Sequence, residues 1–348
     1  MKKVILLFAF IAIAVVACQD NSDEISPTQE TLNVDMSDFY VYTVDDNFSE
    51  KSSGNDKDDK CHSMKVLNKQ LKENPGLYQK MYNIEKHTRA FIAAKGKPSK
   101  PGGGNGGGGG TTPTPYEGTV NIPVYVYVVY ANSAQNISDN QINSQISVLN
   151  ADFNDTNYND VPSEFQSLGA DIDINFNLAT VDRQANSTSS WGTSNAVKSA
   201  YSAVDGHLTI WVANIGGGIL GYAQFPGGNA STDGVVISPQ YFGTTGTATA
   251  PFDLGRTATH EVGHWLNLRH IWGDGRCKQD DFVADTPSSD GPNYGCPSYP
   301  TVNCRSTDMT MNYMDYTDDA CMNMFTLGQE DRMRSLFATG GAREGLVQ

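Results

Sequence analysis

The sequence predicts an α+β fold for residues 116–348, in which a twisted mixed sheet packs against two long helices. The prediction follows from the order of the elements, which is a strand, a helix, several further strands and then a helix with closely spaced histidines. The chain has 348 residues, so it is long enough to bury a substantial core without depending on disulfide staples.

The first eighteen residues, MKKVILLFAFIAIAVVAC, are typical of an export signal. Two lysines precede an apolar run that is too short for a membrane-spanning helix. The residues that end at Cys18 also resemble a bacterial lipobox, so we expect residues 1–18 to be a lipoprotein signal peptide and Cys18 to carry the lipid. An ordinary signal peptide is the alternative. Either kind of signal peptide predicts export to the cell envelope or to the outside of the cell. The protein would then contact the membrane only through the lipid on Cys18.

Residues 19–94 are predicted to form a partly helical pro-segment. We expect little fixed structure from Asp20 to about Asp59, and two short amphipathic helices within Met64–Ala94, interrupted near Pro75 and Gly76. Residues 95–115 form a Gly/Pro-rich linker whose lysines are exposed to proteases. These ranges predict a precursor with a separable N-terminal part.

The strands of the predicted domain follow from β-branched and alternating residues. NIPVYVYVVY (121–130) is rich in β-branched and aromatic residues, and DIDINFNLATV (171–181) alternates apolar with polar residues. Two further strands are expected at 207–215 and 234–239, separated by a glycine-rich excursion.

Two helices carry recognisable N-terminal signals. Ser138 and Gln141 have capping-box spacing, and Ile137 and Ile142 are placed as a hydrophobic staple. A closing helix is expected after Thr326, which has a capping-box partner in Gln329.

The stretch HEVGHWLNLRH, residues 260–270, carries the chemistry. His260 and His264 lie four residues apart, so on a helix they share one face and can hold one zinc ion. Glu261 can reach a water on that metal without ligating it. His270 lies six residues after His264 and would point away on a continuous helix, so we expect the chain to leave the helix at Asn267.

This stretch resembles the zinc signature of the metzincins, with Asn267 at a position that is normally glycine. Asparagine tolerates the left-handed conformation, so the geometry stays available. Residues 311–325, MNYMDYTDDACMNMF, resemble the metzincin turn that places a methionine beneath the metal. Together with a cysteine-containing insert, residues 116–340 resemble the pappalysin family, particularly its small bacterial and archaeal members.

The resemblance implies a zinc endopeptidase that cleaves proteins or peptides, with an irregular C-terminal subdomain below the cleft. It makes His260, His264 and His270 the zinc ligands and Glu261 the general base and acid. It places Met314 in the supporting turn, although ordinary core packing would explain this residue alone. Tyr316 is similar to a family tyrosine whose hydroxyl could stabilise the oxyanion.

The insert contains four cysteines, for which export predicts two disulfides with three alternative pairings. The resemblance implies the pairs Cys277–Cys304 and Cys296–Cys321. It also implies a structural calcium ion, for which Asp281, Asp285 and the carbonyl of Thr286 offer oxygen ligands. A solvated acidic loop is the alternative.

The resemblance also implies a substrate preference, since relatives cleave before basic residues. Asp319 could sit at the base of the pocket and pair with Arg or Lys after the scissile bond. Asp318, or neither residue, is the alternative.

Cys61 is a lone cysteine in the pro-segment. As a thiolate it could occupy the fourth position on zinc and keep the precursor latent until the 95–115 linker is cut. In relatives restrained this way glycine follows the cysteine, whereas here His62 and Ser63 follow. An unpaired cysteine in a mobile region is the alternative.

The net charge of −15 lies after residue 115, where 10 Lys/Arg face 25 Asp/Glu. Such a surface repels phosphate backbones, which excludes nucleic acid as an expected partner. A catalytically idle zinc-binding peptide-recognition module is the alternative function, but it would not require Glu261. A calcium-stabilised adhesion domain would leave the three histidines unexplained.

Overall fold

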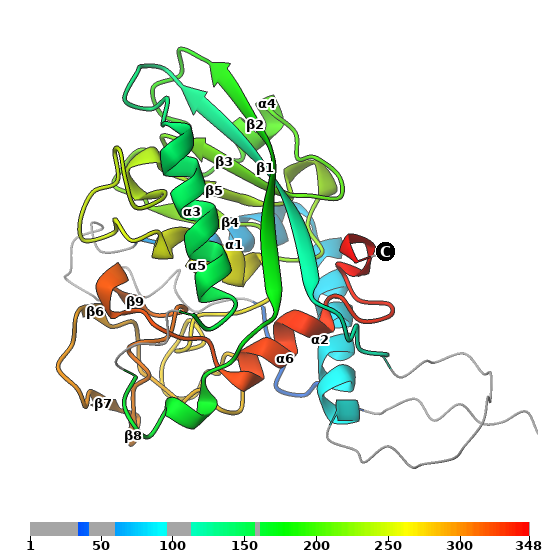
Figure 1. Ribbon diagram of the computed structural model, residues 1–348. Coiled ribbons are helices and arrows are strands. Elements are labelled where there is room, and N and C mark those ends of the chain that lie inside the picture. The colour runs from blue at the N-terminus through cyan, green and yellow to red at the C-terminus, as the bar shows by residue number, and fades with distance from the viewer. Residues whose placement is uncertain (1–33, 42–59, 96–112, 157–160, 348) are drawn as a thin grey trace, which may run out of the picture.

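The computed structural model describes residues 34–41, 60–95, 113–156 and 161–347 (Figure 1). The signal peptide, Cys18 and the greater part of the 95–115 linker lie outside the described residues. Within the described ranges no helix combines the length and the apolar composition that crossing a membrane requires.

A five-stranded mixed sheet forms the upper part of the molecule, with the strand order β2-β1-β3-β5-β4. Four strands are parallel, and β4 alone runs antiparallel to its neighbour β5. The strands are β1 (Val120–Tyr130), β2 (Ile174–Ala185), β3 (Leu208–Ala213), β4 (Gly221–Ala223) and β5 (Val235–Ile237). The mixed sheet and its flanking helices confirm the predicted fold class.

Two helices cover one face of the sheet, α3 (Asp139–Asp152) and α5 (Arg256–Trp265) (Figure 1). The core lies between these helices and the strands, because alternate residues of each strand point to this face. Its buried side chains come from the strands (Ile122, Val124, Val126, Ile174, Phe176 and Ile210) and from α3 and α5 (Ile142, Leu149 and Val262). On the other face, the short helix α4 (Ala196–Ala200) covers the ring of Trp211.

The capping box predicted at the start of α3 is only half formed. The Ser138 hydroxyl accepts a hydrogen bond from the Gln141 amide (3.2 Å), as expected. The Gln141 side chain instead donates to the carbonyls of Pro239 (3.0 Å) and Phe242 (2.8 Å). Its amide group donates to carbonyls of the Pro239–Phe242 loop, so tertiary contacts replace the local bond.

The glycine-rich excursion between the third and fourth predicted strands contains β4, which the sequence analysis missed. Gly221–Ala223 is only three residues long, and its first residue is glycine, so neither length nor β-propensity marks it. It packs against α5 and lies at the edge of the sheet.

The pro-segment forms the two predicted helices, α1 (Ser63–Glu73) and α2 (Gly76–Lys95). The expectation of little fixed structure between Asp20 and Asp59 is wrong for residues 34–41. There Val41 is fully buried, and the rings of Phe39 and Tyr40 contact Phe282. Aromatic side chains spaced along a polar segment supply this packing, and a composition argument overlooks it.

The C-terminal part lies below the sheet and is irregular (Figure 1). It has two small sheets and the closing helix α6 (Leu327–Ser335), whose predicted capping box between Thr326 and Gln329 is confirmed. The small strands are β6 (Tyr294–Gly295), β7 (Val302–Asn303), β8 (Ser306–Thr307) and β9 (Tyr316–Thr317). Short 3-10 helices occupy Gln166–Leu168, Ala230–Thr232, Pro239–Tyr241, Asp319–Cys321 and Glu344–Leu346.

Two disulfides cross this part, Cys277–Cys304 and Cys296–Cys321. They are the pairs that the resemblance implied. Cys61 is the one free cysteine among the described residues, and it is buried.

Candidate active site and metal centre

Helix α5 ends where the sequence analysis expected it to end. Asn267 has a left-handed φ of 72°. The Leu268 amide donates to the Gly263 carbonyl (2.9 Å) and the Asn267 amide donates to the His264 carbonyl (3.0 Å). These two bonds form a Schellman motif, which reverses the chain and lets His270 face the helix it has just left.

The three histidines converge through their Nε2 atoms. His264 Nε2 lies 3.2 Å from His260 Nε2 and 3.1 Å from His270 Nε2. Four tetrahedral ligands at the usual zinc–nitrogen distance would be about 3.3 Å apart. The spacing therefore fits a zinc site.

Each ring is oriented by an acceptor on its other nitrogen. His260 Nδ1 lies 2.7 Å from the Tyr313 carbonyl oxygen, and His264 Nδ1 lies 2.8 Å from the Leu268 carbonyl oxygen. His270 Nδ1 pairs with the Asp274 carboxylate. These acceptors hold the protons on Nδ1 and leave the Nε2 lone pairs directed at one point, which is how proteins orient metal ligands.

Burial favours the neutral, metal-binding form of His260 and His264. Desolvation lowers the pKa of His260 to about 3 and lowers the pKa of His264 well below its ordinary value. Neutral imidazoles can bind a cation without first losing a proton.

Cys61 completes the cluster as a fourth ligand atom. Its Sγ lies 3.5 Å from His264 Nε2, and the four ligand atoms lie within 4.8 Å of one another. Burial raises the pKa of the Cys61 thiol, but a bound cation would favour the thiolate. The donor set of three imidazoles and one thiol suits zinc.

The backbone beside Cys61 is held by β4 without a glycine after the cysteine. The Leu220 amide donates to the Lys60 carbonyl (3.0 Å), and the His62 amide donates to the Gly221 carbonyl (3.1 Å). This pairing is parallel. The pro-segment thus extends the edge of the sheet directly above the histidines.

Glu261 is buried and receives a hydrogen bond from the pro-segment. The Ser63 hydroxyl donates to Glu261 Oε2 (2.6 Å) and accepts from the Ala223 amide (2.7 Å). Burial raises the pKa of Glu261 to about 7, although the Ser63 bond opposes the shift. Sequence reasoning missed Ser63, whose only signal was its position two residues after Cys61.

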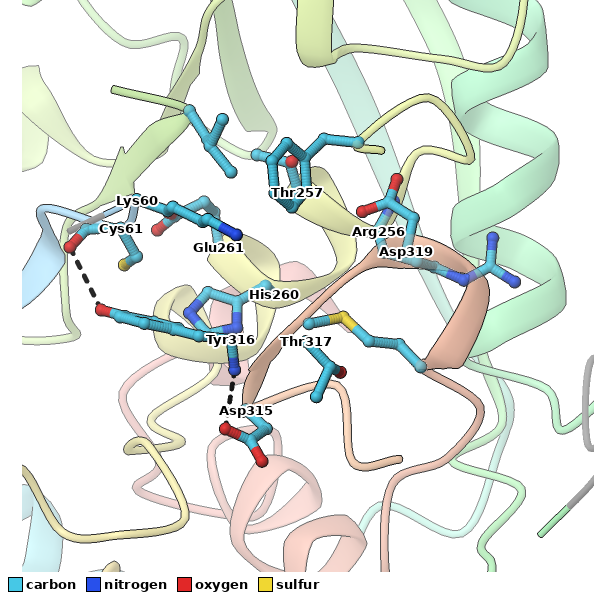
Figure 2. Close-up of a pocket in the computed structure, with 13 residues that line it drawn as sticks. Lys60, Cys61, Arg256, Thr257, His260, Glu261, Asp315, Tyr316, Thr317 and Asp319 are labelled. Carbon is cyan, nitrogen blue, oxygen red and sulfur yellow. Dashed lines mark hydrogen bonds between the residues drawn. The ribbon is translucent and has the colours of Figure 1, made fainter. Parts of the chain in front are cut away.

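Tyr316 and Met314 both pack close to this centre. The Tyr316 hydroxyl donates to the Cys61 carbonyl (3.2 Å), and Figure 2 shows Tyr316 and Cys61 beside Glu261 and His260. Met314 is fully buried, and a Cβ added to Gly263 would lie 2.5 Å from its sulfur. The methionine therefore packs directly against α5 beneath the histidines.

A pocket next to Glu261 contains the side chain of Lys60 (Figure 2). Its Nζ lies 4.1 Å from the centroid of the Phe252 ring and 3.8 Å from Asp318 Oδ1. Asp319 also lines this pocket, but its carboxylate accepts hydrogen bonds from the amides of Leu254 (2.9 Å) and Arg256 (3.1 Å). Burial raises the pKa of Asp319 to about 6.

The acidic residues of the insert contact protein donors. The Asp281 carboxylate accepts from the Thr286 hydroxyl (2.8 Å), and burial raises its pKa well above the ordinary value. Asp285 accepts from the Thr326 hydroxyl (2.7 Å) and the Gly328 amide (2.9 Å), so it caps α6. Calcium at these residues stays a prediction of the resemblance.

Asp274 and Tyr313 are further residues that the sequence did not point out. Asp274 precedes a disulfide-bonded insert and had no motif to mark it, and Tyr313 contributes to the site mainly through its backbone carbonyl. Both belong to the supporting layer that orients the histidines.

Comparison with known proteins places this site in a family. The family model described as pregnancy-associated plasma protein-A matches residues 211–338. An extracellular metalloprotease of Coccidioides posadasii is 36% identical over 238 residues, which cover 64% of this chain and 78% of that protein. One of Pyricularia oryzae is 37% identical over 238 residues, covering 64% and 76%.

Two solved structures from Tannerella forsythia are also similar. Mature mirolysin in complex with a cleaved peptide is 48% identical, with a TM-score of 0.64, and the match covers 66% of this chain and 96% of that one. A promirolysin mutant is 41% identical, with a TM-score of 0.68, and the match covers 82% of this chain and 96% of that one. The chain belongs to the pappalysin family and is a metalloprotease with a metzincin-type fold.

Proposed function

We propose that this protein is an exported zinc endopeptidase made as a latent precursor. The observation that carries the proposal is the convergence of three buried Nε2 atoms at zinc spacing, with Glu261 on the same helix. The extracellular relatives and the similarity to a proprotease support export and latency.

Glu261 has the position of a general base and acid. The chemistry that zinc supplies when bound is activation of water and polarisation of a carbonyl. Glu261 would take the proton of the attacking water and return it to the leaving amine. The Tyr316 hydroxyl, which now donates to a peptide carbonyl, would donate to the developing oxyanion of a substrate.

Latency follows from three neighbouring contacts of the pro-segment. The Cys61 thiol lies beside the histidines, the Cys61 carbonyl accepts a hydrogen bond from the Tyr316 hydroxyl, and the Ser63 hydroxyl donates to Glu261 (2.6 Å). Each group that would act on a substrate is therefore engaged. The parallel pairing of this segment with β4 supports a non-productive mode of binding.

Cleavage before basic residues is the specificity we infer. Lys60 supports this inference because its side chain lines the pocket beside Glu261. Among the described residues, Asp318 lies within ion-pair distance of that ammonium group (3.8 Å), whereas Asp319 is hydrogen-bonded to the turn before α5. We therefore assign the contact with substrate to Asp318 and a positioning role to Asp319.

The remaining parts of the proposal concern the chain outside this site. We assign residues 1–18 to a lipoprotein signal, 19–94 to the pro-segment, 95–115 to the linker and 116–348 to the catalytic domain. Loss of metabolic lipid labelling in Cys18→Ser would support the anchor, and unchanged labelling would contradict it.

We also propose a calcium ion in the insert. Added Ca²⁺ should then raise the melting temperature of the protein, and an unchanged melting temperature would contradict the calcium site.

The test is digestion of a mixed peptide library after proteolytic removal of the pro-segment. We expect cutting that a zinc chelator abolishes and that Glu261→Ala reduces roughly a thousandfold, with unchanged zinc content. Asp318→Asn should weaken selection of Arg and Lys after the cut more than Asp319→Asn does. Bound zinc without any cutting would instead favour the idle peptide-recognition module.

A further inference from the structure

The pro-segment is joined to the catalytic domain by a buried ion pair far from the histidines in sequence. Glu85 on α2 accepts two hydrogen bonds from Arg332 on α6, at 3.1 and 2.8 Å. Glu85 is 3% exposed and Arg332 is 1% exposed. A bidentate pair of this kind is geometrically specific, and removing one partner of such a buried pair is costly.

A second contact involves residues 34–41 and the loop after His270. The Tyr40 hydroxyl lies 2.7 Å from the carbonyl oxygens of Gly273 and Asp280. The Arg269 guanidinium donates to the Tyr40 carbonyl and lies 4.6 Å from the centre of the Tyr40 ring. The same guanidinium lies 4.4 Å from the Phe282 ring.

Arg269, Phe282 and Arg332 therefore form one surface of the catalytic domain, which we call the docking patch. Phe282 connects its two cations, because Arg332 also lies over this ring (5.8 Å) and donates to its carbonyl (3.2 Å). The pro-segment presents a carboxylate and aromatic rings to the patch, so charge and ring stacking are complementary.

Apolar packing adds to this contact. Buried side chains of the pro-segment enclose Phe225 of the catalytic domain in one cluster: Val41, Met64, Leu67, Leu71, Leu77 and Met81. Figure 1 shows α2 at the side of the molecule, where α6 packs against it. Thr88 of α2 and Ser335 of α6 share a buried hydrogen bond (2.8 Å).

All of these contacts are made by residues 34–41 and 63–91. None of them requires an intact peptide bond between residues 96 and 112. We propose that the pro-segment is a separable inhibitor, which stays docked on the catalytic domain after the linker is cut and can rebind to it in trans. This inference rests on the proposed function and revises the expectation that linker cleavage activates the enzyme by itself.

The consequence is a two-step activation. Cutting the linker converts the precursor into a latent complex of two chains, in which Cys61 and Ser63 still cover the site. Activity then requires dissociation of the pro-segment or a second cut within it. The partner that the docking patch recognises is thus the pro-segment itself, through Glu85 on α2 and the aromatic residues of the non-helical stretch 34–41.

The experiment uses the full precursor with a recognition sequence for an unrelated, sequence-specific protease in the glycine tract 102–110. After complete cutting, we expect the two fragments to co-elute in gel filtration at micromolar concentration. We also expect activity below a tenth of that reached after trypsin has digested the pro-segment. Separate elution together with full activity after the single cut would overturn the proposal.

Two variants test whether retention of the cut pro-segment depends on the docking patch. Glu85→Gln keeps the shape of the side chain but removes its charge, and we expect it to weaken retention roughly a hundredfold. Glu73→Gln is the matched control, because Glu73 is an exposed residue of the same segment that pairs with Lys69 of its own helix. Equal retention in both variants would show that the patch is not the determinant.

Alkylation of Cys61 gives a readout that does not depend on catalysis. The thiol should stay protected in the cut complex and should react once the pro-segment dissociates, since Cys61 is 6% exposed when docked. Rapid alkylation in the cut wild-type complex would contradict the inference. A protein that shows protection but never cuts peptides, even after trypsin, would instead contradict the proposed function alone.

Discussion

Asn267 matters at the scale of the single residue because its conformation turns His270 towards the other histidines. Its φ is 72°, and its side-chain amide nitrogen has no hydrogen-bond partner among the described residues. Tolerance of the left-handed region therefore explains its use here. Asn267→Ala should cost about 1–2 kcal/mol, whereas Asn267→Gly should cost nothing or stabilise the protein.

Thermal unfolding and zinc content would check this prediction. We expect a melting temperature about 2–6 °C lower for Asn267→Ala, with easier loss of zinc to a chelator. Equal losses of melting temperature in Asn267→Ala and Asn267→Gly would mean that the asparagine side chain, and not the backbone conformation, stabilises this turn.

Ser63 is the residue through which the pro-segment reaches Glu261. Ser63→Ala removes a bond to a carboxylate and leaves the Ala223 amide without its acceptor, which together should cost the latent form about 1–3 kcal/mol. The intact precursor should then be activated by trypsin roughly tenfold faster. Lys69→Ala, at an exposed position of α1, is the control, and equal activation rates would exclude the proposed role of Ser63.

The sequence revealed the residues that share one short motif and missed those that reach the site from elsewhere. The His260–His270 spacing predicted the three converging rings and the break at Asn267, because both follow from helix geometry. Ser63 comes from a point about two hundred residues away, and the Tyr313 carbonyl is a backbone atom. Neither leaves a pattern in residue types.

At the scale of elements, α5 depends on close approach of the turn that carries Met314. A Cβ on Gly263 would lie 2.5 Å from the Met314 sulfur and 3.4 Å from its methyl carbon. Gly263→Ala gains helix propensity but forces a buried side chain to move, and we expect a net loss of about 1–2 kcal/mol. Chemical unfolding would measure it, with Gly291→Ala as control because no atom lies near the added Cβ there.

An unchanged or higher stability of Gly263→Ala would mean that the methionine turn relaxes freely. In that case the turn would not define the floor of the histidine site. A loss confined to Gly263→Ala would show that the two elements pack as a fixed pair.

Elements with a repeating pattern were predictable, and elements held by tertiary contacts were not. The strand at 121–130 and the capping box at Thr326 follow from local sequence, and both are present. Gln141 had the same capping-box spacing, yet its side chain donates hydrogen bonds to the carbonyls of Pro239 and Phe242. The three-residue strand β4 exists because β5 pairs with it, which no local propensity records.

For the whole molecule, composition separated the pro-segment from the catalytic domain but did not show how they meet. The glycine-rich linker predicts the boundary, and helical periodicity located α1 and α2. The packing of residues 34–41 and the pair between Glu85 and Arg332 depend on distant partners. Docking therefore had to be learned from the structure.

The ion pair between Glu85 and Arg332 makes docking sensitive to acid. Burial opposes ionisation of Glu85, but Arg332 and Arg89 more than offset it and lower the pKa of Glu85 from 4.5 to about 2. Because the docked pKa is the lower one, the undocked segment binds a proton more readily. Arg89 stays with the undocked segment, so only the part of this shift that Arg332 supplies favours docking; that contribution is present above pH 4.5 and is lost as the pH falls towards 2.

The charged groups that face Glu85 are Arg332 from α6 and Arg89 from its own helix, and Arg269 also interacts with it electrostatically. The measurement is retention of the cut pro-segment between pH 6 and pH 3, in wild type and in Glu85→Gln. We expect the wild type to retain the cut pro-segment better than Glu85→Gln by a constant factor above about pH 5. This difference in retention should shrink steadily below pH 4.5. An advantage that stays constant down to pH 3 would mean that another group controls release in acid, and that the ion pair positions α2 without governing its affinity.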